Sequence, residues 1–357
     1  SFILNNKNKA LALYTLTAYN LYLTLIAPIQ AHLTNIKHLI IVPDNDLGHI
    51  PFEALLSTFS EQRETDYKVL NYLLNDYSIS YSYSASLSLE NKQYKRGKNN
   101  SKILGFAATY NPKDSIFPER SPSNLKLRQT LEALPAATEE VLALQKQFLN
   151  SDFFFGEKAT EANFKAHAPN YSILHLAMHG IVNHHHPLLS SLAFTEDYSE
   201  TENNFLEAHE ISNLQLNNDL VVLSACETGY GEFEQGEGII SLARSFMYAG
   251  TPSLVVSLWE VNDFSTAIIM QLFYQYLTDG MTKDKALRQA KLDFIQRSDG
   301  IITHPAFWSP FILLGDNQPI VFHQTNSPWK WGVFGLIIIA SIFLIYLKNR
   351  SSKKQLR

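Results

Sequence analysis

Two short apolar runs that lead into reactive side chains constrain the fold of this chain more than any other feature. Ile173–Met178 and Leu220–Leu223 are bounded by turn residues and have the length of buried parallel strands. His179 and Gly180 follow the first run, and Cys226, the only cysteine, follows the second. Ligands bind beyond the carboxyl ends of strands in open α/β sheets, so we expect this imidazole and this thiol to share one site.

A thiol and an imidazole at one site indicate nucleophilic catalysis. His179 can take the proton of the Cys226 thiol, either as a general base or as the cationic half of an ion pair. Attack on a carbonyl creates an oxyanion, and the backbone amides of Gly180 and Cys226 are candidate donors to it. The alternative is purely structural, because a lone cysteine at a strand end is often a buried packing residue.

Strand-like and helical runs alternate along the chain, which is typical of an α/β fold. We expect strands at 38–42, 103–107, 173–177, 220–223 and 254–258, and helices at 10–26, 137–149, 239–249 and 266–278. Residues 77–84 alternate polar and apolar side chains, so we expect an edge strand there. Residues 111–123 are rich in proline and are predicted to form a long surface loop.

Composition excludes several classes of protein. A chain of 357 residues that is 45% hydrophobic can bury a substantial core, and its net charge of -5 gives no general attraction to nucleic acid. One cysteine excludes an intramolecular disulfide. His184–His186 has no further ligand at a suitable spacing and is predicted to be a solvated loop, so we expect no metal. Gly229–Gly238 lacks the lysine of a phosphate-binding loop, and we expect it to be mobile beside Cys226, with no cofactor.

An uncharged apolar segment lies near the end of the sequence. Residues 332–347 approach the length that crosses a bilayer, and tryptophan and tyrosine flank them as in an interfacial aromatic belt. The alternative, a buried core helix, is less favoured because only the polar, basic tail 348–357 follows. The tail carries five Lys or Arg residues, so the positive-inside rule predicts a cytoplasmic tail and a globular part on the opposite side of the membrane.

Motifs spread over residues 20–316 resemble the CHAT domain of the caspase and separase superfamily. They are Leu39–Asp44, Ile50–Leu55, Leu134–Pro135, Glu139–Val141, Gly156–Glu157, Ala159–Glu161, Ile173–Gly180, Pro187–Leu192, Leu220–Gly229, Gly236–Gly238, Ser257–Trp259, Val261–Asp263, Ala286–Ala290 and His304–Trp308. The resemblance implies a caspase-like three-layer sandwich with a mostly parallel sheet, and a peptidase dyad of His179 and Cys226 that forms a thioester acyl-enzyme. Glu227 and Asp263 are candidates for the substrate pocket, although Asp263 could equally cap the following helix.

These expectations define an organisation and a function. Residues 1–30 are expected to end an upstream helical-repeat region that binds a regulatory protein, because relatives in the family carry tetratricopeptide repeats there. Residues 31–316 would form the CHAT domain, with an N-terminal portion (31–110) and a catalytic half (130–316), followed by a linker (317–331), the membrane helix and the tail. The predicted function is a membrane-anchored cysteine peptidase that acts on protein substrates. A catalytically silent scaffold and an acyltransferase with the same dyad are the alternatives.

Overall fold

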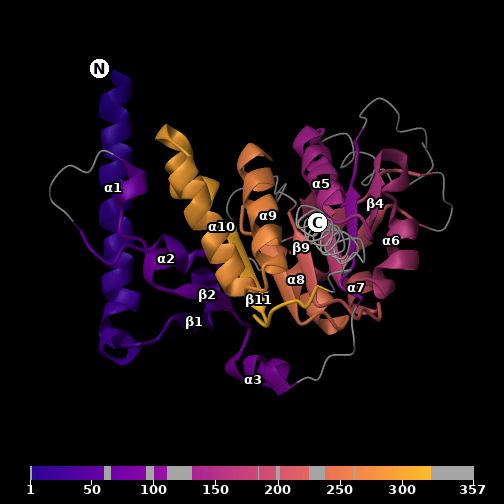
Figure 1. Cartoon of the computed structure of the whole chain (residues 1–357), viewed down its shortest axis with the longest axis horizontal. Helices are drawn as coiled ribbons and strands as arrows, with labels where there is room; N and C mark the ends of the chain where they lie inside the picture. Colours follow the sequence, from indigo (N-terminus) through magenta and orange to yellow (C-terminus); the bar gives the residue numbers. More distant parts are fainter. Residues whose placement is uncertain are drawn as a thin grey trace, which may run out of the picture. The chain divides into compact units, whose positions relative to one another are not determined.

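The computed structural model describes residues 2–59, 66–93, 100–110, 131–183, 185–197, 202–224, 238–259 and 263–322 (Figure 1). Residues Ser1–Val321 form one compact unit, and Phe322–Arg357 form a second. The predicted membrane span 332–347 and the tail 348–357 lie outside the described residues. Among the described residues, no single helix is both long enough and apolar enough to cross a membrane. Within the same residues, one pair of consecutive helices, Lys9–Leu25 and Ala27–Leu33, meets both criteria when taken together, but the two are bent by 63° relative to each other.

An eight-stranded sheet and a separate three-stranded sheet carry the fold. The large sheet has the strand order β1-β2-β11-β10-β9-β5-β3-β4, and the small sheet has the order β6-β7-β8. The strands are His38–Ile41 (β1), Ser78–Tyr81 (β2), Ile103–Ala107 (β3), Asp152–Phe155 (β4), Ile173–Ala177 (β5), Gly180–Ile181 (β6), Ser191–Ala193 (β7), Phe205–Glu207 (β8), Leu220–Leu223 (β9), Ser253–Ser257 (β10) and Phe311–Gly315 (β11).

One antiparallel pairing divides the large sheet into two parallel blocks. The strands β4, β3, β5, β9 and β10 run in one direction, and β11, β2 and β1 run in the other. The seam is the pairing of β10 with β11, in which Val255 lies opposite Leu313. The carboxyl ends of β3, β5, β9 and β10 therefore lie at the same edge of the sheet. Within the sheet, β1 and β2 connect to the larger block through β11.

Helices cover the sheet on both faces, as Figure 1 shows. The α5, α9 and α10 helices pack side by side on one face, where α5 lies on β3 and β5 and α10 lies on β2. The α8 helix packs on β10 from the other face, together with α6 and α7. The α-helices are Phe2–Leu25 (α1), Leu73–Asp76 (α2), Ala85–Gln93 (α3), Pro135–Gln147 (α5), Glu161–His167 (α6), Ala208–Ser212 (α7), Gly238–Tyr248 (α8), Asp263–Thr278 (α9) and Lys283–Arg297 (α10).

Local sequence accounts for several helix ends. Pro135 begins α5, where its missing N–H costs no helical hydrogen bond. The Thr160 side chain accepts a hydrogen bond from the Asn163 amide and caps α6. Glu207 and Glu210 form a reciprocal capping box on α7. After α8, Gly250 has φ +111°, and a Cβ there would lie 2.4 Å from the carbonyl oxygen of Leu216, so this turn requires glycine.

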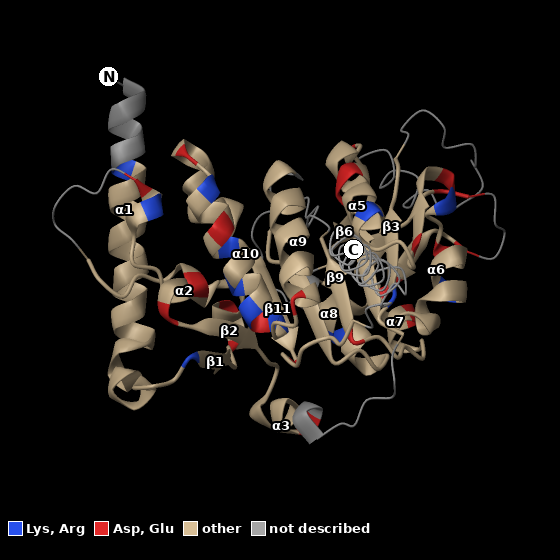
Figure 2. Ribbon diagram, in the orientation of Figure 1, with Lys and Arg blue, Asp and Glu red and all other residues tan. Residues whose placement is uncertain are grey.

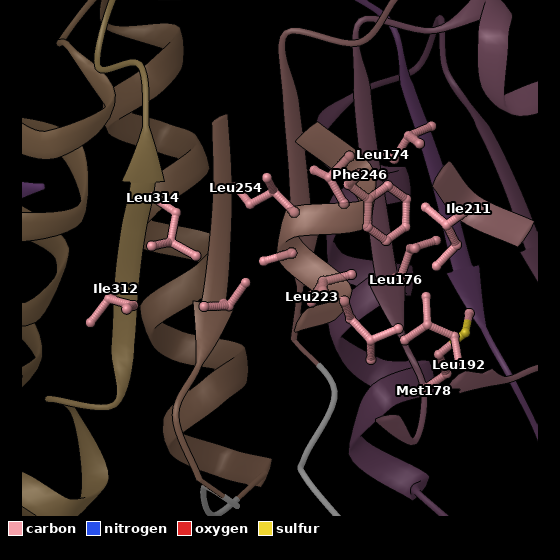
Figure 3. Packing of buried hydrophobic residues seen from close by; sticks show 14 of the residues in the cluster. Leu174, Leu176, Met178, Leu192, Ile211, Leu223, Phe246, Leu254, Ile312 and Leu314 are labelled. Atoms are coloured by element: carbon pink, nitrogen blue, oxygen red, sulfur yellow. The ribbon is translucent and has the colours of Figure 1, made fainter. Parts of the chain in front are cut away.

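Alternate residues of β5 contribute to different layers. Leu174 and Leu176 pack with Ile211 of α7 and Phe246 of α8 in the main hydrophobic core (Figure 3). The intervening residue His175 faces α5 and α9. Both faces of this strand are buried, which agrees with its residues being apolar except for His175.

Buried ion pairs join α10 to Glu53, which precedes β2, and to Asp316, which follows β11. Lys291 of α10 lies 3.1 Å from the carboxylate of Glu53, which also accepts a hydrogen bond of 2.5 Å from the Tyr81 hydroxyl. Lys283 lies 3.0 Å from Asp316, and both side chains are buried. Burial lowers the pKa of Lys291, which Glu53 partly restores. Figure 2 shows α10 carrying basic and acidic residues along its length.

The predicted α/β architecture with a mostly parallel, helix-flanked sheet is confirmed. The strands predicted at 103–107, 173–177 and 220–223 are observed within those limits. The prediction of an edge strand at 77–84 is wrong, because β2 pairs with both β1 and β11 and β1 is the edge. Its alternating serines are buried and contact polar partners instead of solvent: Ser78 donates to the buried Asp284 at 2.5 Å, and Ser80 lies 3.0 Å from Nε2 of the partly exposed His38.

Candidate active site

A tyrosine hydroxyl anchors the backbone of His179 at the carboxyl end of β5. The His179 N–H donates to the Tyr110 hydroxyl at 3.0 Å, and that hydroxyl donates to the Ala193 carbonyl at 2.7 Å. The Ala193 N–H donates to the His179 carbonyl at 2.9 Å. Tyr110 follows β3, so its position belongs to the same edge of the sheet as His179. Two residues, Tyr110 after β3 and Ala193 of β7, therefore hold the histidine backbone through direct hydrogen bonds, and a third bond links them to each other.

The imidazole of His179 is held in one tautomer. Its Nε2 atom lies 2.8 Å from the backbone carbonyl oxygen of Glu132, and the Tyr110 ring packs against it with centroids 4.7 Å apart. A carbonyl only accepts hydrogen bonds, so Nε2 carries the proton and the neutral ring has its lone pair on Nδ1. The Glu132 carbonyl thus orients the ring and leaves Nδ1 as the nitrogen that can accept a proton.

Gly180 begins the small sheet directly after the histidine. It lies opposite Leu192 of β7, and Ile181 lies opposite Ser191. The small sheet continues through β8 into α7, so the segment after β5 is tied to a second layer of structure. A change in the position of β7 would therefore be transmitted to His179 and Gly180.

The end of β9 lies beside the end of β5. The Ser224 N–H donates to the Leu176 carbonyl at 3.2 Å, which continues the parallel pairing one residue past β9. Cys226 and Glu227, the predicted nucleophile and one predicted pocket residue, lie outside the described residues. Asp263, the other pocket residue, is the first residue of α9. The structure thus brings Ser224 and His179 to one edge, which is where the argument from strand ends expects the thiol.

The structure describes part of the histidine tract and only the last residue of the predicted glycine-rich loop. Gly229–Glu237 of the glycine-rich segment lies outside the described residues, and α8 begins at Gly238. Of the histidine tract, His185 and His186 are exposed, and the His186 N–H donates to the Asn183 side chain at 2.9 Å. These two residues lie in a surface turn.

One group of acidic side chains within the described part of the chain has the spacing of a metal site. Oxygens of Glu161, Glu202 and Glu210 lie within 4.8 Å of one another. The ammonium of Lys165 lies 2.7, 2.7 and 3.1 Å from these three carboxylates. The lysine supplies the positive charge, so the cluster is an internal salt-bridge network that fastens α6 to α7. Burial raises the pKa of Glu161 to about 7; Lys165 opposes that rise and Glu202 adds to it.

An apolar pocket of about 240 Å³ lies between α1 and residues at the end of β10. Trp259, two residues past β10, forms part of its wall, and its indole N–H donates to the Ala306 carbonyl at 3.2 Å. Tyr14 of α1 lines the opposite side, where its hydroxyl donates to Ala54 at 2.5 Å. The α1 helix therefore contributes to a cavity that is also lined by residues 50–55, Trp259 and residues 304–309.

Comparison with known proteins identifies the family. A family model described as the CHAT domain matches residues 15–316. The chain belongs to the CHAT domain family. Tetratricopeptide repeat protein 28 of Homo sapiens is 25% identical to the CHAT chain over 351 residues, which covers 86% of this chain and 13% of the relative. The Mus musculus protein of the same name is 23% identical over 346 residues, with the same coverage. The CHAT chain thus spans 13% of the length of these relatives.

Solved structures with similarity to the CHAT chain include two complexes. The Saccharomyces cerevisiae separase–securin complex matches with a TM-score of 0.46 and 12% sequence identity. The match covers 78% of this chain and 15% of the matched chain in that complex. The complex of the Porphyromonas gingivalis RgpB pro- and mature domains matches with a TM-score of 0.46 and 10% sequence identity. The match covers 86% of this chain and 69% of the matched chain in that complex.

Two residues that hold His179 were missed in the sequence. Tyr110 could have been found, because it follows the predicted strand 103–107 at the edge where the other strand ends carry His179 and Cys226. Glu132 contributes only its backbone carbonyl, which every residue type possesses. No residue pattern in the sequence marks such a contact.

Proposed function

We propose that this CHAT domain is a caspase-like cysteine peptidase in which His179 is the base and Cys226 is the nucleophile. The observation that carries the proposal is the 2.8 Å contact between His179 Nε2 and the Glu132 carbonyl oxygen. It leaves the basic lone pair on Nδ1 of a histidine at the carboxyl edge of the sheet, beside the strand that leads to the only cysteine.

The chemistry requires two steps through one acyl-enzyme. His179 Nδ1 takes the proton of the Cys226 thiol, and the thiolate attacks the carbonyl carbon of the substrate peptide bond. The tetrahedral oxyanion receives hydrogen bonds from the amides of Gly180 and Cys226, and the C–N bond breaks as the imidazolium protonates the leaving amine. Water, deprotonated by His179, then hydrolyses the thioester and restores the thiol. Glu227 and Asp263 are proposed to contact the substrate beside this site.

Covalent labelling tests the proposal directly. A peptide bearing a thiol-reactive electrophile should label the full chain, and Cys226→Ala should abolish labelling because it removes the nucleophile. His179→Ala should slow labelling at neutral pH, since an unassisted thiol is mostly protonated there. His185→Ala is the matched control, because His185 is an exposed histidine in a surface turn. Cleavage of a library substrate that persists in Cys226→Ala would exclude the proposed mechanism.

A catalytically silent scaffold is the second candidate. The observation that favours it is the burial of His179, which is 3% exposed. A scaffold has no requirement for an activated thiolate, so it predicts that Cys226 reacts with the electrophile no faster than an ordinary cysteine and that His179→Ala has no effect. An acyltransferase would be labelled like a peptidase but would transfer the acyl group to an amine acceptor instead of water. Mass spectrometry of the products separates these two enzymes.

We further propose that the chain is anchored in a membrane by residues 332–347, with the globular part outside the cytoplasm and an upstream helical-repeat region that binds a regulatory protein. The apolar character of the segment and its basic flank support the anchor. The name of the tetratricopeptide relatives supports the upstream repeats. Resistance to carbonate extraction tests the anchor. Protease shaving of spheroplasts tests the orientation, which is wrong if a C-terminal tag is digested while the globular part is protected.

A further inference from the structure

Three polar side chains are buried together behind the strand that carries His179. His175 of β5 has its Nε2 atom 3.0 Å from Glu140 Oε1 of α5 and its Nδ1 atom 3.1 Å from the Tyr274 hydroxyl of α9. His175 and Tyr274 are fully buried, and Glu140 is 4% exposed. The three side chains connect one strand to the two helices that cover it.

The protons in this cluster follow from the chemistry of the three groups. Burial raises the pKa of Tyr274 well above its ordinary value, and the charge of Glu140 adds to that rise, so the hydroxyl keeps its proton. The contact between His175 Nε2 and Glu140 lacks the alignment of a regular hydrogen bond, so the attraction is mainly electrostatic. One of the two atoms must carry a proton, because two lone pairs at that distance would repel each other.

Packing alone does not explain such a cluster. Apolar residues of similar volume usually stabilise a core as well as a buried charged pair does, because the pair loses its hydration. The neighbouring contacts of α5 with β3 and β5 are indeed apolar and include Val141 and Ala177. The polar cluster therefore calls for a role other than stability.

The α5 segment contacts both histidines of the β5 segment. Glu140 reaches His175, and the carbonyl of Glu132, three residues before the helix begins, holds the ring of His179. Glu132 lies in neither a helix nor a strand, so the placement of α5 on β5 determines where its carbonyl points. The contact with His175 fixes that placement at a single point.

We propose that Glu140, His175 and Tyr274 are positioning residues that lock α5 and α9 onto β5 and thereby hold the Glu132 carbonyl against His179. The inference rests on the proposed function only in that His179 is the base. Glu140 also lines a cavity shared with Ala177 and Ser224, but its volume of about 10 Å³ admits at most one water molecule. That size excludes a pocket for a substrate side chain, so Glu140 acts through His179 and not on the substrate.

The tautomer of the His179 ring reports whether the Glu132 carbonyl holds it, and it can be measured without any substrate. In the full chain labelled with ¹⁵N in its histidine rings, the His179 signals are assigned by their loss in His179→Gln. The wild type should show the Nε2–H tautomer alone. Glu140→Leu removes the partner of His175 and should give a mixture of both tautomers, whereas Glu140→Gln keeps an acceptor and should restore the single form. Tyr274→Phe, which deletes only a hydroxyl, provides a second variant if Glu140→Leu does not fold.

A matched control separates positioning from stability. Leu144 is a buried apolar residue of the same helix, so Leu144→Ala destabilises the domain by packing alone. It should leave the His179 tautomer unchanged. The inference is overturned if Leu144→Ala gives as large a fraction of the second His179 tautomer as Glu140→Leu does. It is also overturned if both Glu140→Leu and Tyr274→Phe show only the Nε2–H tautomer of His179.

Cleavage assays then distinguish this inference from the proposed function. If the domain is a peptidase, Glu140→Leu should cleave a library substrate roughly 10- to 100-fold more slowly than wild type, because small displacements of a catalytic group are costly. Glu140→Gln should recover most of the rate. A wild type that cleaves nothing, together with the expected tautomer changes, would refute the peptidase function and support the positioning cluster.

Discussion

The hydroxyl of Tyr110 accepts the backbone N–H of His179 at 3.0 Å and donates to the carbonyl of Ala193. It is the point at which the end of β3, the end of β5 and the small sheet meet. Tyr110→Phe should destabilise the domain by about 1–3 kcal/mol, because it leaves a buried N–H and a buried carbonyl without this partner. Urea unfolding of wild type and variant measures the difference. Tyr248→Phe is the control, since Tyr248 is 75% exposed, and an equal loss in both would contradict this account.

The salt-bridge network around Lys165 predicts an unusual dependence of stability on pH. The pKa of Glu161 rises from 4.5 to about 7 on folding, so between these values the folded state holds a proton that the unfolded chain has lost. Stability should therefore fall as the pH is raised from about 4.5 to 7 and change little from this group above that range. Glu161→Gln should flatten this part of the profile. The unfolding midpoint measured across the range tests it, and an unchanged slope in the variant would count against the raised pKa.

Breaking the ion pair between Glu53 and Lys291 should be costly. Glu53→Leu leaves a buried lysine without its counter-ion and should lower the free energy of unfolding by about 3–5 kcal/mol. The loss should shrink as the pH approaches 10, because the folded lysine then gives up its proton while the unfolded one keeps it. The double variant Glu53→Leu with Lys291→Met should recover much of the loss. Arg297→Gln breaks an exposed pair and should cost no more than about 1 kcal/mol.

The proposed dyad should behave as one unit. His179→Ala and Cys226→Ala each disable the same proton transfer and attack, so the double variant should cleave a substrate scarcely more slowly than Cys226→Ala alone. Rates for the wild type, both single variants and the double variant form the test. If the two losses multiply, the residues act independently and the dyad is not supported.

Strands buried on both faces were the most predictable part of the fold. The runs 103–107 and 220–223 are uninterrupted and apolar, and 173–177 is apolar except for His175, so their limits were visible in the sequence. The β2 strand was misplaced because Ser78 and Ser80 suggest a solvent-facing side, whereas both serines are buried and contact polar side chains. The α10 helix was missed for the same reason: its lysines suggest exposure, yet Lys283 and Lys291 are buried in ion pairs.

The candidate site was predictable only through side chains with recognisable chemistry. His179 and Cys226 follow apolar strands, and that pattern led to the roles that we propose for them; of the two, His179 lies within the described residues. The contacts that orient His179 come from a tyrosine hydroxyl and a backbone carbonyl contributed by segments remote in sequence. Their positions depend on the pairing of β3 with β5 and on the packing of α5, which are properties of the assembled fold.

The antiparallel seam between β10 and β11 limits how this domain can be cut or transplanted. β11 comes from the end of the domain, yet its other neighbour, β2, comes from residues before position 82. A fragment that starts at β3 would expose the long edge of β11 to other chains and would leave Lys291 without Glu53. Grafting the domain onto another protein, or recombining it between relatives, should therefore succeed only when the first two strands travel with the last one.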